Sequence, residues 1–260
     1  MQKIVWAKTL AAIWRAKKGI LRPVNEVDKV YLNELIGIDN QKEQMVENVM
    51  RFIEGKTFNH VLLWGARGTG KSSLIKAMLM EFHAKKLRVI EVARDDLSDL
   101  PDIIDNLRVL PYYFLIFCDD LSFEAGDSSY KGLKSTLEGS IEAPANNVLI
   151  CATSNRRHLV SEDIADNDNA VVRRGELHYG DAVEERISLS DRFGLWLSFY
   201  HGTLKDYLDT VDFYFKDFDG DRELLHQEAK EFSALRASRS GRTAKQFYNS
   251  FKDKFIKRKN

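Results

Sequence analysis

The chain has 260 residues, of which 44% are hydrophobic and 30% are charged. A chain of this length and composition can bury a full core and keep a charged surface, which favours one large domain with a smaller attached unit. Its 39 basic and 39 acidic residues cancel, so net charge gives no argument for nucleic-acid binding, and any such contact must come from a local patch.

Disulfide bonds and membrane-spanning helices are not expected. Cys118 and Cys151 each lie in an apolar run, where a reduced thiol behaves as a small hydrophobic group, and this favours a cytoplasmic protein. No stretch approaches the roughly 20 apolar residues that a membrane-spanning helix needs.

Residues 1–34 are predicted to form a basic amphipathic helix followed by a linker. As far as Val24 the segment carries six basic residues and no acidic one, and its apolar residues include Trp6 and Trp14. Such a helix either packs on its own domain or docks on a membrane or a partner, and both interpretations stay open.

A turn at Leu35-Ile36-Gly37 precedes a helix that apolar periodicity predicts over residues 41–53. Because glycine permits close backbone approach, Ile36 and Gly37 are predicted to form an apolar slot for an adenine ring. The alternative is an ordinary entry into the helix.

Residues 60–74 have the pattern of a buried strand, a glycine loop and the start of a helix, and they match G-x-x-x-x-G-K-[ST]. The glycines let backbone N–H groups face a β-phosphate. Lys71 is expected to reach the β- and γ-phosphates, and the Ser72 hydroxyl to bind Mg²⁺. The alternative is a plain glycine turn. The predicted nucleotide-binding residues are Ile36, Gly37, Gly65, Ala66, Arg67, Gly68, Thr69, Gly70, Lys71, Ser72 and Ser73.

A second strand over 87–92, a crossover helix over 97–107 and a buried strand over 112–118 follow, and the last of these ends in Asp119-Asp120. In a parallel sheet that end faces the ligand crevice, so Asp119 is expected to complete the metal site with Ser72. Asp120 is expected to polarise a water for attack on the γ-phosphate, and Glu124 is a second candidate base. Two aspartates after a strand also form ordinary turns.

A helix is predicted over 130–141 and a fourth strand over 146–155, whose end delivers Asn155. Its amide can hydrogen-bond both the γ-phosphate and the attacking water, although Asn is also common in turns.

Residues 159–185 are predicted to be an irregular connection. Arg192 stands just before a fifth strand over 194–200. Helical patterns over 204–215, 222–237 and 243–255 complete the chain, with Arg242 at the start of the last.

These motifs occur in the order found in AAA+ ATPases. From about Leu35 to its end, the chain resembles a bacterial family of predicted AAA+ ATPases catalogued as a domain of unknown function. The Asp-Asp pair is similar to that of replication initiators and helicase loaders. The matching segments are Gly65 to Ser72 for Walker A, Asp119 and Asp120 for Walker B, Asn155 for sensor 1, Ser190 to Phe193 for the arginine finger and Ser240 to Phe247 for sensor 2.

The resemblance implies a three-layer α/β/α P-loop core with a parallel five-stranded sheet over 35–201, followed by a small helical lid over 202–260. It implies ATP and Mg²⁺ as cofactors and catalytic roles for Asp120, Asn155, Arg192 and Arg242. Arg192 would act on the γ-phosphate of a neighbouring subunit in a homo-oligomer. The alternative for both arginines is an exposed position at the start of a strand or a helix.

Two functions are compatible with this pattern. The first is ATP hydrolysis at a subunit-shared site that drives remodelling or loading of an unidentified protein partner. The second is an ATP-gated binding or assembly switch of the initiator or loader kind, with DNA as one candidate contact. Because Asp120 is one methylene shorter than the usual Glu, slow hydrolysis is expected.

Overall fold

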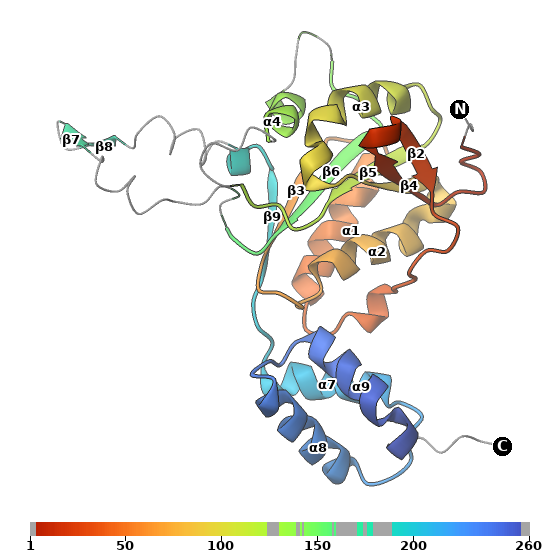
Figure 1. Cartoon of the computed structure of the whole chain (residues 1–260), viewed down its shortest axis with the longest axis vertical. Coiled ribbons are helices and arrows are strands. Elements are labelled where there is room, and N and C mark those ends of the chain that lie inside the picture. The colour runs from red at the N-terminus through yellow and green to blue at the C-terminus, as the bar shows by residue number, and fades with distance from the viewer. Residues whose placement is uncertain are drawn as a thin grey trace.

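The structure, a computed structural model, describes residues 4–123, 130–138, 141, 143–157, 159 and 189–255, and the backbone of 171–173 and 176–178. An α/β core carries a separate group of three helices at its C-terminal end (Figure 1). Within the described part of the chain, no helix has both the length and the apolar character needed to cross a bilayer.

The core is built on a seven-stranded sheet with the order β2-β1-β4-β5-β6-β3-β9. All neighbouring strands are parallel except β1 and β2, which form an antiparallel hairpin. The strands are β1 (Ala11–Arg15), β2 (Ile20–Pro23), β3 (Val61–Gly65), β4 (Leu87–Glu91), β5 (Tyr113–Cys118), β6 (Val148–Ser154) and β9 (Leu195–Phe199).

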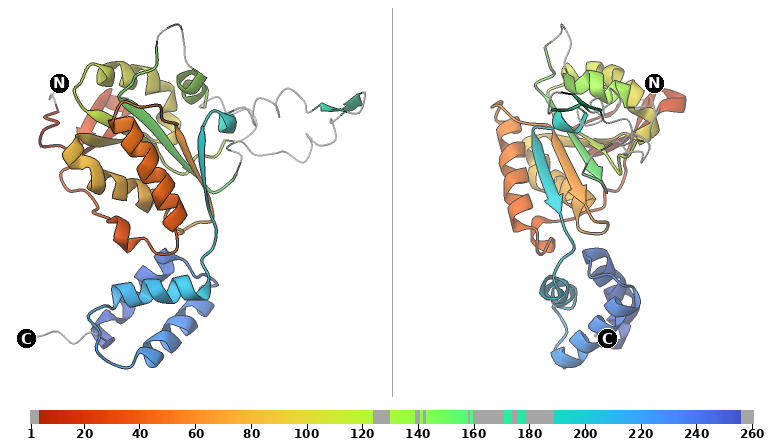
Figure 2. Two further views of the ribbon diagram at one scale, coloured as in Figure 1. Left: turned by 180° about the vertical axis from the view of Figure 1, so that it is seen from behind. Right: turned by 90° about the vertical axis from the view of Figure 1, so that its left-hand side faces the viewer.

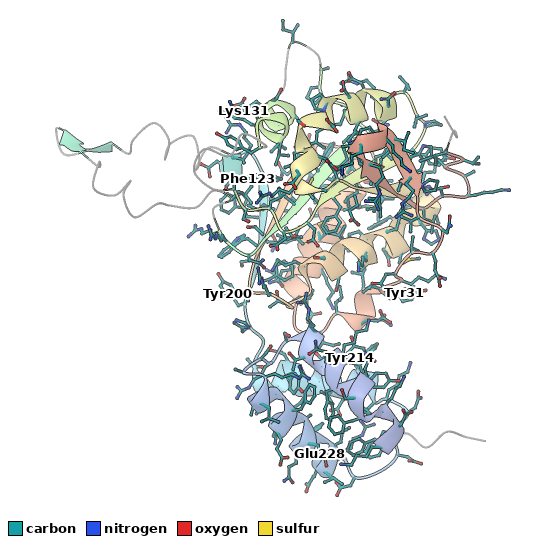
Figure 3. All side chains as sticks on the ribbon, in the orientation of Figure 1. Tyr31, Phe123, Lys131, Tyr200, Tyr214 and Glu228 are labelled. Carbon is teal, nitrogen blue, oxygen red and sulfur yellow. The ribbon has the colours of Figure 1, made fainter. Side chains whose placement is uncertain are left out.

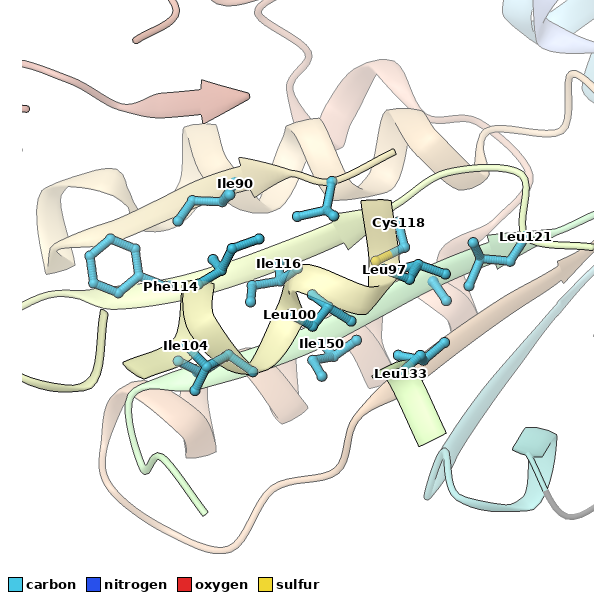
Figure 4. Close-up of a cluster of buried hydrophobic side chains, with 14 of the residues drawn as sticks. Ile90, Leu97, Leu100, Ile104, Phe114, Ile116, Cys118, Leu121, Leu133 and Ile150 are labelled. Atoms are coloured by element: carbon cyan, nitrogen blue, oxygen red, sulfur yellow. The ribbon is translucent and has the colours of Figure 1, made fainter. Parts of the chain in front are cut away.

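Helices cover both faces of the sheet and make the three layers (Figure 2). One face is covered by α1 (Asp39–Ile53) and α2 (Lys71–Phe82), and the other by α3 (Leu100–Arg108) and α4 (Lys131–Glu138). On the second face, Leu100 and Ile104 of α3 pack over Phe114, Ile116 and Ile150 of the sheet (Figure 4). The described residues also form short 3-10 helices, η1 (Ala16–Lys18), η2 (Leu32–Glu34), η3 (His83–Lys85) and η4 (Arg94–Asp99).

The prediction of a three-layer α/β/α P-loop core is confirmed, but the predicted strand number is wrong. All five predicted strands are present, as β3, β4, β5, β6 and β9, and the N-terminal segment adds two more. The predicted N-terminal helix is also wrong. Ala11 and Ala12 are buried beside β4, and Gly19 adopts a left-handed φ of 58° that turns the chain back into β2. Pairing with β4 overrides the helical spacing of the apolar residues.

Part of the predicted irregular connection over 159–185 contains a two-stranded antiparallel sheet, formed by β7 (Val171–Arg173) and β8 (Glu176–His178). The rest of that segment beyond Leu159 lies outside the described residues, as does the candidate base Glu124.

The C-terminal helices are α7 (Leu204–Tyr214), α8 (Arg222–Leu235) and α9 (Gly241–Phe255), which pack around their own aromatic cluster. Thr203 begins α7 with a capping box: its hydroxyl accepts from the Asp206 N–H, and the Asp206 carboxylate accepts from the Thr203 N–H. Asp221 caps α8 by accepting from the N–H groups of Glu223 and Leu224. We call these three helices the lid.

Candidate nucleotide-binding site

The glycine loop between β3 and α2 adopts backbone angles that favour glycine. The φ angles of Gly65, Gly68 and Gly70 are 129°, 77° and 101°. A Cβ atom on Gly65 would lie 1.9 Å from the Phe199 carbonyl oxygen, so only glycine lets β3 end this close to β9. The loop therefore places its N–H groups and the start of α2 at the carboxyl edge of the sheet, where an anion binds favourably.

Lys71, the first residue of α2, is buried with its ammonium group in this loop. Its Nζ donates to the carbonyl oxygens of Gly65 and Ala66, each at 2.7 Å, and to Oδ1 of Asn155 at 3.2 Å. Burial lowers the pKa of Lys71, and the Asp120 and Asp119 carboxylates oppose this effect. The ammonium group of Lys71 is thus held within the glycine loop, with each of its three N–H donors directed to a protein acceptor.

Asp119 and Ser72, the residues predicted to bind a metal ion, lie side by side. The Ser72 hydroxyl donates to Oδ1 of Asp119 at 2.9 Å, and Thr153 of β6 donates to the same oxygen at 2.5 Å. A hydroxyl and a carboxylate side by side are ligands that suit Mg²⁺, so this donor set fits the ion.

Asp120 follows β5 in a left-handed conformation, with φ of 52°. Its N–H donates to the Thr153 hydroxyl at 2.8 Å, and its Oδ1 accepts a hydrogen bond from Nδ2 of Asn155. The left-handed turn costs energy for a residue with a Cβ, and such strain is found at functional sites. Thr153 therefore fixes both aspartates, and Asn155 joins Asp120 to Lys71.

The lid reaches the same loop from the other side. A Cβ atom on Gly68 would lie 2.9 Å from the Ser240 hydroxyl and 3.3 Å from Cβ of Arg242, so the start of α9 contacts the glycine loop. Arg242 is exposed and lies near enough to Lys71 to act on its pKa. The structure thus brings this arginine to the site.

The residues predicted to form an adenine slot lie between the core and the lid. Ile36 is half-buried, and a Cβ atom on Gly37 would lie 3.2 Å from the Asp206 side chain of α7. Ile38, the next residue, reaches within 3.5 Å of such an atom on Gly70. Tyr31 and Tyr200 lie on opposite sides of the molecule, at the height where the core meets the lid (Figure 3).

The remaining residues predicted to bind nucleotide are Thr69, Arg67 and Ser73. The Thr69 hydroxyl donates to the Ala66 carbonyl at 2.7 Å and closes the loop on itself. Arg67 is exposed, and Ser73 is half-buried on α2.

Arg192 lies at the opposite edge of the sheet, just before β9 begins. Its guanidinium donates to the Glu138 carboxylate of α4. It lines a groove of about 780 Å³ at the amino ends of β3, β6 and β9. The Asn59 side chain packs where a Cβ of Gly194 would be, 2.2 Å from Oδ1, and fixes the backbone beside Arg192. The structure does not bring Arg192 to the glycine loop of its own chain.

Sequence reasoning missed two residues of this site, Thr153 and Asp206. Thr153 is a buried hydroxyl two residues before Asn155, and a polar residue at the end of an apolar strand was a detectable signal. Asp206 was identifiable as a helix-cap partner, but its contact with Gly37 depends on how the lid docks.

Similar solved structures share the fold of this chain, and they include variants of RuvB. A variant of RuvB from Thermotoga maritima matches with a TM-score of 0.52 and 15% identity over 85% of this chain and 72% of that chain. A second RuvB variant matches with a TM-score of 0.52 and 15% identity over 87% of this chain and 74% of that one.

The chain belongs to the family described as "Protein of unknown function (DUF815)", whose model matches residues 7–255. It is also similar to the probable replication factor C subunit 5 of Caenorhabditis elegans, with 26% identity over 145 residues. That match covers 48% of this chain and 37% of the relative, which is well under two thirds of the relative's length.

Proposed function

We propose that this protein is an AAA+ ATP hydrolase whose site is completed by a second copy of the chain. The observation that carries the proposal is one connected network at the glycine loop. In it, Lys71, Asn155 and Asp120 are joined by hydrogen bonds, and Thr153 links Asp120 to the Ser72–Asp119 pair.

ATP would bind with its β- and γ-phosphates on the N–H groups of the loop, between the core and the lid. Lys71 and Arg242 would neutralise the phosphoryl group, and Asn155 would align the attacking water. Asp120 would orient that water and accept its proton. The water oxygen forms a bond to the γ-phosphorus as the bond to the β–γ bridging oxygen breaks, which gives ADP and inorganic phosphate.

Ser72 and Asp119 would hold Mg²⁺, since their oxygens lie 2.9 Å apart and suit that ion. When bound, the ion supplies positive charge to the β- and γ-phosphate oxygens.

Arg192 would act on the nucleotide of a neighbouring copy, because it lies at the opposite edge of the sheet from its own glycine loop. A head-to-tail contact between copies brings one amino edge to the next carboxyl edge. An arginine supplied in this way is worth roughly 10³ to 10⁵ in rate.

The test is phosphate release per subunit against protein concentration, for wild type, Arg192→Ala and Asp120→Asn. We expect the rate to rise with concentration, each variant alone to be nearly inactive, and an equal mixture of the two to regain activity. In the mixture, an intact Arg192 meets an intact Asp120. Arg239→Ala, which removes an exposed arginine of the lid region, is the matched control and should behave as wild type.

A mixture that stays inactive while both variants still bind ATP would overturn the shared site. Arg192→Ala with wild-type turnover would overturn the arginine's role. The unidentified protein partner would be sought by affinity capture on Asp120→Asn, in which ATP should stay unhydrolysed and keep the partner bound.

An ATP-gated switch with little hydrolysis is the second candidate, and two contacts favour it. The Asp120 carboxylate already accepts from Asn155, and Arg192 is engaged by Glu138. The switch predicts tight ATP binding with negligible phosphate release at every protein concentration, so brisk turnover by an isolated subunit would contradict it.

A further inference from the structure

The hairpin formed by β1, η1 and β2 carries four exposed cations, Arg15, Lys17, Lys18 and Arg22, which we call the basic hairpin. None of the four forms an ion pair with any other residue that the structure describes. The first acidic residue of the sequence is Glu26. The hairpin is therefore a local positive patch on a chain of zero net charge.

The geometry of the hairpin concentrates this charge. Arg22 is paired with Ile13 in register and Arg15 with Ile20, so the two arginines are diagonal neighbours on one face. Lys17 and Lys18 lie in the turn, and no atom lies within 4 Å of the position a Cβ of Gly19 would take. The turn is therefore open to solvent around Gly19.

Acidic side chains lie near the hairpin, but among the described residues none of them forms an ion pair with its cations. Glu91 of β4 lies beside Ile13 in register and forms no ion pair with either arginine. Asp99 lies against the other face, where one carboxylate oxygen accepts from the Trp14 indole N–H at 2.8 Å.

Because β1 runs parallel to β4, its turn leaves the sheet at the carboxyl edge, the same edge as the glycine loop. A ligand on the basic hairpin would therefore lie at the nucleotide-binding edge, next to neither Arg192 nor the groove around it.

We infer that the basic hairpin binds the phosphate backbone of duplex nucleic acid. Unpaired lysines and arginines gain binding energy by releasing the counterions of a polyphosphate backbone. Because β1 is paired with β4, the turn and the outer strand β2 are the parts of the hairpin that would contact the duplex. A membrane surface is the less suitable partner, because none of the large exposed hydrophobic residues found in the described chain lies on the hairpin.

The test measures binding of the full chain to a short labelled duplex by fluorescence anisotropy, between about 50 and 200 mM salt. The variant carries Lys17→Gln, Lys18→Gln and Arg22→Gln. The matched control, Lys216→Gln, Lys230→Gln and Arg239→Gln, removes the same charge from exposed positions in the lid region.

We expect the hairpin variant to bind every duplex sequence at least tenfold more weakly at low salt, and the slope of log affinity against log salt to fall by about 3. The control should keep wild-type binding. Circular dichroism and Mg²⁺-ATP binding should be the same for all three proteins, which shows that folding is retained.

Absence of duplex binding by wild type, or equal binding by the hairpin variant, would overturn the inference. So would hairpin-dependent binding to vesicles of anionic lipid without duplex binding. The measurement requires no ATP turnover, so its outcome is independent of whether the proposed hydrolysis is observed.

Discussion

At the scale of single residues, His60 shows how burial fixes a charge state. Its Nδ1 accepts from the Ile150 N–H at 3.1 Å, so in the neutral ring the proton is on Nε2. Burial lowers the pKa of His60 to about 4. The imidazole is therefore neutral in the folded protein at physiological pH, whereas in the unfolded chain it titrates near its ordinary value.

This difference predicts a loss of stability in mild acid. Below the unfolded pKa of about 6.5 the unfolded chain binds a proton that the folded chain does not, so the free energy of unfolding falls as pH falls toward 4. Between pH 7 and pH 5, we expect wild type to lose roughly 2 kcal/mol more than His60→Gln, whose side chain can still accept from Ile150. Urea unfolding at both pH values measures this, and parallel losses in the two proteins would contradict it.

At the scale of elements, the glycine loop depends on how closely β3 and β9 approach. Gly65 ends β3 under the Phe199 carbonyl, where a methyl group has no room. Gly55, after α1, also has a positive φ, of 68°, but no atom lies within 4 Å of its missing Cβ. At φ of 129° Gly65 also lies outside the left-handed well that Gly55 occupies, so alanine is expected to cost more at Gly65 in backbone conformation as well as in steric clash.

Gly65→Ala should therefore be much more destabilising than Gly55→Ala. The control carries only the left-handed penalty of roughly 1 to 2 kcal/mol. Gly65→Ala adds a clash with backbone atoms that forces β9 away from β3, so we expect a further loss of several kcal/mol or failure to fold. Chemical denaturation of both variants measures the difference, and equal losses would show that β9 is free to shift.

The elements also show what the sequence could predict. Apolar runs and helical periodicity located the five parallel strands and the helices, because those patterns are local. The N-terminal hairpin was missed because its strands depend on pairing with β4, which is over 70 residues away from Ala11 in the sequence. In the candidate site, the predicted residues belong to short motifs, which can also be recognised from local sequence. The role of Thr153 depends on the pairing of β5 with β6, and that of Asp206 on lid docking.

At the scale of the whole molecule, the core and the lid have separate hydrophobic clusters and meet at the glycine loop. Ser240 and Arg242 of the lid contact Gly68, and Asp206 contacts Gly37. A nucleotide bound at this junction would touch both bodies and hold them together.

Mg²⁺-ATP should therefore stabilise the whole chain against heat. A ligand at 100 times its dissociation constant adds about 2.7 kcal/mol to the free energy of unfolding. We expect Tm to rise with Mg²⁺-ATP, to rise less with ATP in EDTA, and to stay unchanged for Lys71→Ala. Differential scanning calorimetry measures this, and a wild-type Tm that is insensitive to Mg²⁺-ATP would contradict the nucleotide site.

The two outer strands of the sheet have a consequence for aggregation. The outer strand β2 is only four residues long, contains Arg22 and ends in Pro23. These three features discourage pairing with a further strand. On the opposite rim, Gln41 of α1 donates to the Ser198 carbonyl of β9 at 2.7 Å. With both rims protected, copies of the chain at high concentration should not join into continuous intermolecular sheets, and amyloid-type fibres are not expected from the native state.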